Sequence, residues 1–173
     1  MKTRVYYKDA PEYCHYYFDL VDTDHLLNEL EGSKEVTIRV LDRITQENLY
    51  FSPGPKKWNI AEIIRHIIDC ERVYSYRAFR FSRFDPKALP SFDENRYVDV
   101  IQNHVINLYE LREEYEHVRN STISLYKQMN DEMLDFKGRA NQVVFTPRSL
   151  GFMTVGHNLH HIQTIVNSYL QQN

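Results

Sequence analysis

Near its C-terminal end the chain reads Thr146-Pro147-Arg148-Ser149-Leu150-Gly151-Phe152-Met153-Thr154-Val155-Gly156-His157-Asn158-Leu159-His160-His161-Ile162-Gln163-Thr164-Ile165. Thr146 followed by Pro147 predicts a helix start, because the hydroxyl can cap free backbone amides and the ring suits the first turn. Residues at steps of three, four or one then predict one inward face. That face consists of Leu150, Met153, His157, His161, Thr164, Ile165 and Ser168.

Two histidines lie on this face four residues apart, so both imidazoles leave the helix on the same side. Two such nitrogens can bind one divalent metal ion, and a third ligand from another helix would complete a three-ligand site. An isolated pair with this spacing is more often a hydrogen-bonded core histidine beside a half-exposed one. Gly151 and Gly156 each cost about 1 kcal/mol against alanine in a helix, and therefore predict close approach by a neighbouring helix or a ligand.

A second helix supplies the third candidate ligand. Asn59 can cap its start and Glu62 can reach back as in a capping box. Ile63, His66, Ile67, Cys70, Tyr74, Arg77 and Phe81 follow at helical spacing. A lone histidine on such a stripe is more often a satisfied core residue than a ligand. Together with His157 and His161 on another inward face, His66 is better interpreted as the third metal ligand.

Composition limits the classes of protein. The 173 residues are enough for one domain with a full core. The 21 basic and 24 acidic side chains nearly balance, without a long basic run, which disfavours nucleic acid and anionic membrane as partners. No apolar run could span a bilayer, and the N-terminus lacks a signal-peptide core. We therefore expect a cytoplasmic protein in which Cys14 and Cys70 are reduced.

The remaining chain divides into an arm and a single-domain bundle. Residues 1–21 are rich in tyrosine and are expected to pack across the body, a subunit contact being the alternative. The bundle spans 22–173. Its first helix is expected to begin near Asp22 or Thr23 and to run to about Ile44, and a connection over 45–57 follows.

The third helix is indicated by a regular three-four alternation from Val105 to Met129. A charged set is expected on its solvated side: Glu110, Arg112, Glu113, Glu114, Glu116 and Arg119. His104 and His117 fall outside the stripe and are interpreted as surface histidines. A longer crossover over 131–146 leads to the last helix, and residues 142–145 could be extended but are too few to predict a sheet. The pattern predicts an all-α four-helix bundle, a fold that commonly holds metal sites between facing helices.

Four stretches of the sequence form a recognisable set: Lys57 to Arg72, Tyr76 to Arg80, Leu89-Pro90-Ser91-Phe92-Asp93-Glu94 and Gly156-His157-Asn158-Leu159-His160-His161. In these stretches the chain resembles the DinB/YfiT-like metalloenzymes of the DinB superfamily. The resemblance implies a four-helix bundle that holds zinc or nickel through positions matching His66, His157 and His161. It also implies a small-molecule substrate, with low-molecular-weight thiols among the family's co-substrates. Ile162-Gln163-Thr164 departs from a frequent Arg-Gly-Gln version, so these flanking residues support no substrate inference.

Three imidazoles leave one open position on a tetrahedral ion, which favours catalysis over a structural role. Hydrolysis and transfer of a low-molecular-weight thiol both remain open, and a non-catalytic metal-binding or ligand-sensing bundle is the alternative. Cys70 could close the site as a fourth ligand, although a small core residue is the preferred interpretation. Asp69, Glu71, Tyr74 and Arg77 are candidate helpers for which salt bridges or core hydroxyls are the simpler roles. His160 is rotated about 100° from His161 and is not expected to share the ion. The aromatic arm also suggests a homodimer.

Overall fold

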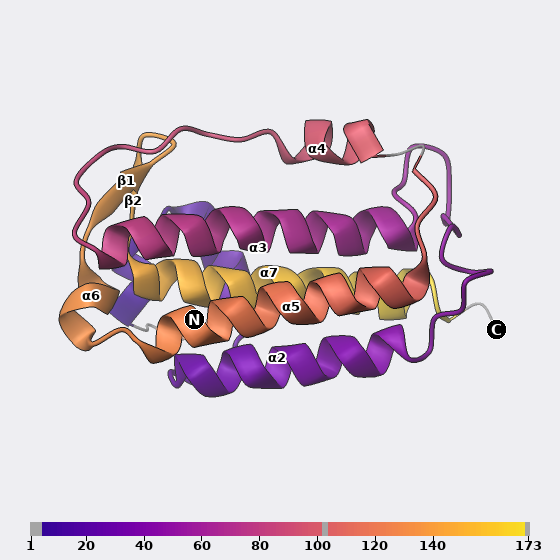
Figure 1. The fold of residues 1–173 in the computed structure, drawn as a ribbon, viewed down its shortest axis with the longest axis horizontal. Coiled ribbons are helices and arrows are strands. Elements are labelled where there is room, and N and C mark those ends of the chain that lie inside the picture. Colours follow the sequence, from indigo (N-terminus) through magenta and orange to yellow (C-terminus); the bar gives the residue numbers. More distant parts are fainter. Residues whose placement is uncertain (1–4, 102–103, 172–173) are drawn as a thin grey trace.

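The computed structural model describes residues 5–101 and 104–171 and shows a bundle of four long helices (Figure 1). These are α2 (Leu26–Leu41), α3 (Ile60–Ser82), α5 (Leu108–Lys127) and α7 (Pro147–Ser168). Within each helix the residues of the predicted stripe are buried or half-buried, except for Ser168 at the end of α7. The prediction of a four-helix bundle is confirmed.

The order of the helices around the bundle places α7 between α2 and α3, and α5 on the opposite side, also between α2 and α3. Two neighbouring pairs run parallel: α3 with α5, and α2 with α7 (Figure 1). Side-chain contacts agree with this, since Arg65 pairs with Glu114 and, about one and a half turns later on both helices, Glu71 pairs with Arg119. Parallel neighbours require a connection that returns along the bundle.

That return is the segment between α3 and α5, which crosses the length of the bundle and contains α4 (Glu94–Ile101) (Figure 1). The connection before α7 contains α6 (Asp131–Asp135) and the strands β1 (Gly138–Ala140) and β2 (Val143–Phe145). Neither α4 nor the hairpin was predicted. Both elements are short, and a short segment shows too few periods for its pattern to be recognised.

The β1–β2 hairpin closes through a two-residue turn at Asn141 and Gln142, both of which have positive φ. Such turns match the right-handed twist of the strands. Leu89, in the connection after α3, bridges to Ala140 and exchanges backbone hydrogen bonds with Arg139 and Asn141. The hairpin therefore fixes the path of the connection that follows α3.

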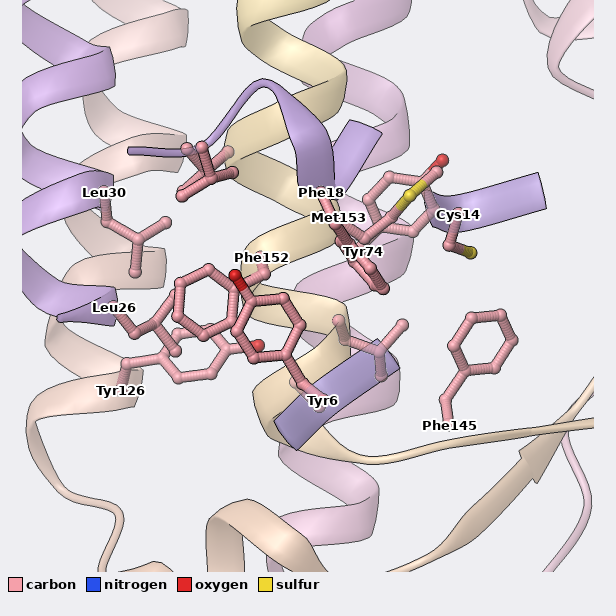
Figure 2. Close-up of a cluster of buried hydrophobic side chains, with 14 of the residues drawn as sticks. Tyr6, Cys14, Phe18, Leu26, Leu30, Tyr74, Tyr126, Phe145, Phe152 and Met153 are labelled. Atoms are coloured by element: carbon pink, nitrogen blue, oxygen red, sulfur yellow. The ribbon is translucent and has the colours of Figure 1, made fainter. Parts of the chain in front are cut away.

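Residues 1–4 of the predicted arm lie outside the described residues, and residues 5–21 contain two 3-10 turns, η1 (Val5–Asp9) and η2 (Glu12–Cys14), and the short helix α1 (His15–Asp19). This part of the arm lies against α7. Tyr6 stacks on Phe152, with ring centroids 3.9 Å apart, and Phe18 meets the edge of Tyr6 (Figure 2). Because Tyr6 and Phe18 are buried, the arm adds to the core. Tyr13 and Tyr16 remain exposed.

Several predicted positions are wrong. Helix α2 begins at Leu26, not at Asp22 or Thr23, and ends at Leu41, before Ile44. The Thr23 hydroxyl and amide both donate to Glu29 in the first turn of α2, so Thr23 binds to that turn from the segment that precedes the helix. Val105 precedes α5 and is 96% exposed, because the chain bends before Asn107 caps the helix. Ser168, the last residue of α7, is exposed.

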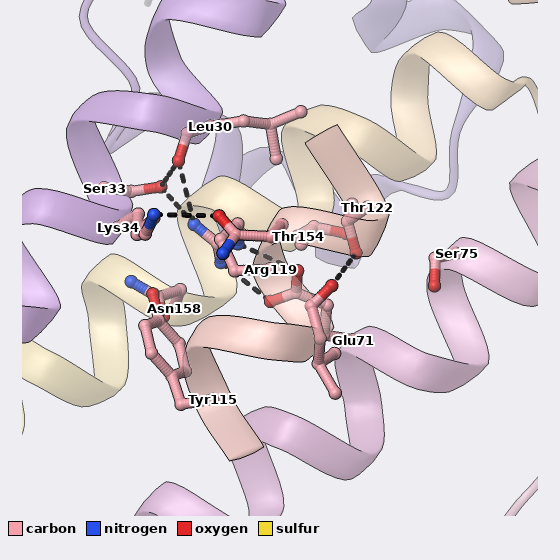
Figure 3. Close-up of polar contacts among 12 residues, drawn as sticks. Leu30, Ser33, Lys34, Glu71, Ser75, Tyr115, Arg119, Thr122, Thr154 and Asn158 are labelled. Atoms are coloured by element: carbon pink, nitrogen blue, oxygen red, sulfur yellow. Dashed lines mark hydrogen bonds and ion pairs between the residues drawn. The ribbon is translucent and has the colours of Figure 1, made fainter. Parts of the chain in front are cut away.

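Arg119 is the largest correction, since it was expected on the solvated side of α5 and is fully buried. It forms an ion pair with Glu71 and donates to the Leu30 carbonyl and the Ser33 hydroxyl (Figure 3). The long side chain satisfies its donors inside the bundle. A charged residue next to an apolar stripe can therefore face inward where a side chain of opposite charge is buried at that point.

The two glycines of α7 mark close approaches, as predicted. A Cβ on Gly151 would lie 2.7 Å from Leu26 of α2 and 3.0 Å from the Tyr126 ring of α5. A Cβ on Gly156 would collide with the backbone of Tyr17 in the arm. In both cases the approaching group is part of the protein. Helix α7 can therefore be surrounded on several sides and still lie close to each neighbour.

No helix among residues 5–101 and 104–171 combines the length and the apolar character that a membrane span needs.

Candidate metal centre

Helix α7 is positioned by its first turn and by a polar contact on the side facing α2 and α5. Thr146 and Ser149 form a reciprocal capping box, and Pro147 follows the cap. Further along, the Asn158 amide donates to the Thr37 hydroxyl at 2.8 Å, and its oxygen accepts from Tyr115. Asn158 faces α2 and α5, so the adjacent His157 faces away from them, toward α3.

The structure brings His66, His157 and His161 together. The Nε2 atom of His157 lies 3.0 Å from Nε2 of His66 and 3.1 Å from Nε2 of His161. One ligand atom from each residue falls within 4.8 Å of the others, a grouping that could hold a metal ion. The histidines come from two antiparallel helices, α3 and α7, and 91 residues separate His66 from His157.

Burial keeps these imidazoles neutral. His66 and His157 are each 5% exposed, and His161 is half-buried. Desolvation lowers the pKa of His66 to about 4 and that of His161 to about 3, and neighbouring histidines add to both shifts. Burial likewise holds the pKa of His157 well below its ordinary value. The neutral form is the one whose ring nitrogen can bind a metal.

Aromatic rings surround the three histidines. Trp58 lies 4.8 Å from the His66 ring, while Tyr17 and Tyr74 contact His157 at 5.6 and 5.8 Å between centroids. His160 points elsewhere, and its Nδ1 is hydrogen-bonded to the Tyr16 hydroxyl at 3.0 Å. It stands outside the group of three, as its rotation along the helix predicts.

Cys70 contacts the group without joining it. Its Sγ lies 3.7 Å from Nδ1 and 3.8 Å from Nε2 of His66. A sulfur equally distant from both ring nitrogens is not aligned with the lone pair of either. The residue is 2% exposed, and burial raises the pKa of its thiol to about 12. Cys70 therefore belongs to the wall beside His66.

A cavity of about 450 Å³ opens onto the three histidines. One side follows α3 and another follows α7. The other walls come from the arm, from the connection after α3 with the start of α4, and from the hairpin. They include Tyr13, Tyr17, Phe92, Glu94, Asn141 and Phe145. Since these segments carry little periodic signal, the sequence did not indicate them as parts of a site.

The candidate helpers divide into two pairs. Asp69 and Glu71 are engaged in ion pairs, with Arg72 and Arg119 respectively, as the simpler interpretation predicted. Tyr74 and Arg77 line the cavity. Both are buried on α3.

A sequence model of the DinB superfamily matches residues 29–165. The chain belongs to this superfamily. The matched range contains all three histidines, but it leaves out the arm and the end of the chain.

Two solved structures share the DinB fold of this chain. YfiT from Bacillus subtilis, described as a probable metal-dependent hydrolase with an unusual four-helix bundle topology, superposes with a TM-score of 0.72 at 15% identity, over 83% of each chain. A mycothiol-dependent maleylpyruvate isomerase superposes with a TM-score of 0.67 at 11% identity, over 84% of this chain and 61% of that one. At these identities the likeness establishes the fold alone. None of the curated protein sequences compared with the chain matches it.

Proposed function

We propose that this protein is a metal-dependent enzyme acting on a small molecule, with His66, His157 and His161 as ligands of a divalent ion, zinc or nickel. The observation that carries the proposal is the convergence of three Nε2 atoms beside a cavity of about 450 Å³. A cavity of this size suits a small molecule.

The residues fit such an ion. Two nitrogens bound tetrahedrally at about 2.0–2.1 Å are separated by about 3.3 Å, and the two short separations here are 3.0 and 3.1 Å. All three imidazoles are neutral at physiological pH. Among the described residues the group contains three ligands and no fourth. Structural zinc sites normally use four protein ligands, so three favour a catalytic site.

The simpler alternative to a metal site is a hydrogen-bonded cluster of core histidines. A neutral imidazole offers one N–H donor and one acceptor, so an N–H···N bond could account for each short separation. This interpretation leaves unexplained why the cluster borders a cavity instead of packed core. It also predicts no metal in the purified protein.

When bound at such a site, a divalent ion can lower the pKa of a water molecule to about 7 or hold a thiol as its thiolate. The protein supplies positioning. Trp58, Tyr17 and Tyr74 restrict the imidazole rings, and Asn158 sets the rotation of α7. Apolar residues of the cavity wall, including Phe145, Leu150 and Met153, limit the water around a bound substrate. We propose hydrolysis or low-molecular-weight thiol transfer as the reaction.

The first test is elemental analysis of protein purified without an affinity tag. We expect close to one zinc or nickel per chain, and loss of that metal in His157→Ala. His117→Ala is the matched control, because His117 is exposed on α5. Absence of metal from the wild type after reconstitution, with the fold intact, would leave the hydrogen-bonded cluster as the explanation.

The second test separates the reactions. The metal-loaded protein is assayed with ester and amide substrates alone, and with electrophiles in the presence of bacillithiol or mycothiol. Turnover that requires the thiol identifies a transferase, and turnover without it identifies a hydrolase. Stoichiometric metal with neither reaction, over a broad panel, supports the alternative of a non-catalytic metal-binding or ligand-sensing bundle.

We also propose a cytoplasmic location and a homodimer. The arm covers most of its aromatic surface on its own α7, so Tyr13 and Tyr16 are its exposed aromatic residues for a subunit contact. Light scattering at tens of micromolar measures the mass directly. A monomer at that concentration would contradict the homodimer.

A further inference from the structure

Arg77 places a positive charge in the wall of the cavity. It lies on α3, and its residue is 6% exposed. Its Nη2 donates to the Pro90 carbonyl at 2.8 Å, and its guanidinium carbon lies 5.2 Å from the centre of the Phe92 ring. Among the described residues no carboxylate forms an ion pair with it.

This arrangement uses little of what a guanidinium offers. Arginine has five N–H donors in a rigid fork and stays charged, although burial lowers its pKa here. Burying an unpaired charge is strongly unfavourable. If the role of Arg77 were only to hold Pro90 against α3, a neutral donor such as glutamine could do so without that cost.

The ionisable groups that face Arg77 do not neutralise it. Tyr13 of the arm and Tyr74 of α3 are uncharged, because burial raises the pKa of both hydroxyls. Glu94, at the start of α4, also lines the cavity, but it is exposed and makes no ion pair with Arg77. The guanidinium is therefore available to an anion inside the cavity.

Arg77 and the three histidines lie at different positions along the cavity. His66, Cys70, Tyr74 and Arg77 lie on one face of α3, and all four line the cavity. Eleven residues correspond to about 16 Å along a helix axis. The cavity thus has the histidine group toward one end and a cation toward the other.

We propose that Arg77 binds a carboxylate of the substrate, so that the protein acts on small carboxylic acids whose reacting group faces the three histidines. This inference rests on the proposed function only where it places the reacting group of the substrate at the three histidines; the binding of a carboxylate by Arg77 does not depend on it. A single guanidinium matches one monoanion in charge and in its planar, two-pronged geometry. A phosphate dianion carries two negative charges, and the single guanidinium would neutralise only one of them.

The test uses probes that engage both ends of the cavity. Monohydroxamates of linear dicarboxylic acids, from adipate to sebacate, carry a metal-chelating group and a carboxylate. Each is paired with the compound in which a primary amide replaces the carboxylate. Affinities for the zinc-loaded protein are measured by calorimetry. At the best chain length we expect the carboxylate to bind about ten- to a hundredfold more tightly than its amide, as for a hydrogen bond to a charged group.

Variants assign the preference to one residue. Arg77→Gln should bind carboxylate and amide equally, and Arg77→Lys should retain part of the preference. Arg80→Gln is the matched control, because Arg80 lies on the same helix, pairs with Asp85 and does not line the cavity. Its preference should equal that of the wild type.

Equal affinity of the wild type for both members of every pair would overturn the proposal, as would a full preference in Arg77→Gln. If Arg77→Gln does not fold, the wild-type comparison still decides. If no hydroxamate binds, the proposed metal ion does not hold the chelating end of the probe. The affinities of 4-phenylbutyrate and 4-phenylbutanamide, which carry no metal-chelating hydroxamate, then test Arg77 independently of the metal. A preference for the acid supports the anion site, and equal or absent binding refutes it.

Discussion

Arg119 of α5 holds Glu71 of α3 through two hydrogen bonds of 2.8 Å inside the bundle. Both side chains are almost completely buried, and the guanidinium also donates to Leu30 and Ser33 of α2 (Figure 3). The pair therefore connects three of the four long helices. It lies on α3 little more than one turn beyond His66, and thus supports the helix that carries one of the three histidines.

Glu71→Gln should destabilise the protein by about 3–5 kcal/mol, because the substitution leaves a buried guanidinium without its counter-charge. Urea unfolding measures the change. Lys127→Ala is the control, since its ion pair with Glu31 is about half exposed, and it should cost less than about 1 kcal/mol. Equal effects of the two substitutions would contradict a dominant role of the buried pair.

The metal-free protein should lose stability as the pH falls below about 6.5. Burial depresses the pKa of His66 to about 4 and that of His161 to about 3, while the unfolded chain titrates near 6.5. Between these values the unfolded state takes up protons that the folded state does not, so its free energy falls relative to the folded state. The expected loss is about 1.4 kcal/mol per pH unit for each histidine.

Denaturant unfolding at pH 7.5 and 5.5 checks this, since most carboxylates remain ionised over that range. The double variant His66→Gln/His161→Gln should show a flatter pH dependence. An equally steep dependence in the double variant would locate the titrating groups elsewhere.

Cys70→Ser should retain the metal. The Sγ atom contacts both nitrogens of the His66 ring and is aligned with neither, so serine removes no ligand. In cobalt-substituted protein, wild type and variant should show the same coordination spectrum, without a thiolate-to-cobalt charge-transfer band. Such a band in the wild type, lost in Cys70→Ser, would mean that protein closes the fourth position, and both proposed reactions would fall with it.

Gly156→Ala should destabilise the protein, because its Cβ would collide with the backbone of Tyr17 and force the arm away from α7. A cost of about 1–3 kcal/mol is typical of such overpacking. Gly32→Ala provides the control, since nothing lies within 4 Å of a Cβ at that position of α2. Alanine there should stabilise the helix by up to about 1 kcal/mol. Thermal unfolding of both variants distinguishes steric conflict from helix propensity.

The sequence by itself determined the local features. Capping residues at Asn59 and Thr146 marked where α3 and α7 begin, and the predicted capping box of Asn59 with Glu62 is present. Helical periodicity placed His66, His157 and His161 on buried faces, because side-chain direction repeats every 3.6 residues whatever the neighbours are. The glycines of α7 indicated close approach for an equally local reason, since any other residue would place a Cβ atom where the neighbouring segment lies.

Only the tertiary structure decided which faces meet. Periodicity turns His66 inward but does not specify whether it faces α5 or α7; the parallel arrangement of α3 with α5 and the rotation of α7 through Asn158 decide that. Arg119 appeared solvated by its local pattern and is buried because Glu71, 48 residues away, offers a counter-charge. The cavity is likewise non-local, since its walls combine the arm, the connection after α3 and the hairpin. Their positions follow from contacts between distant segments, which no spacing within one segment records.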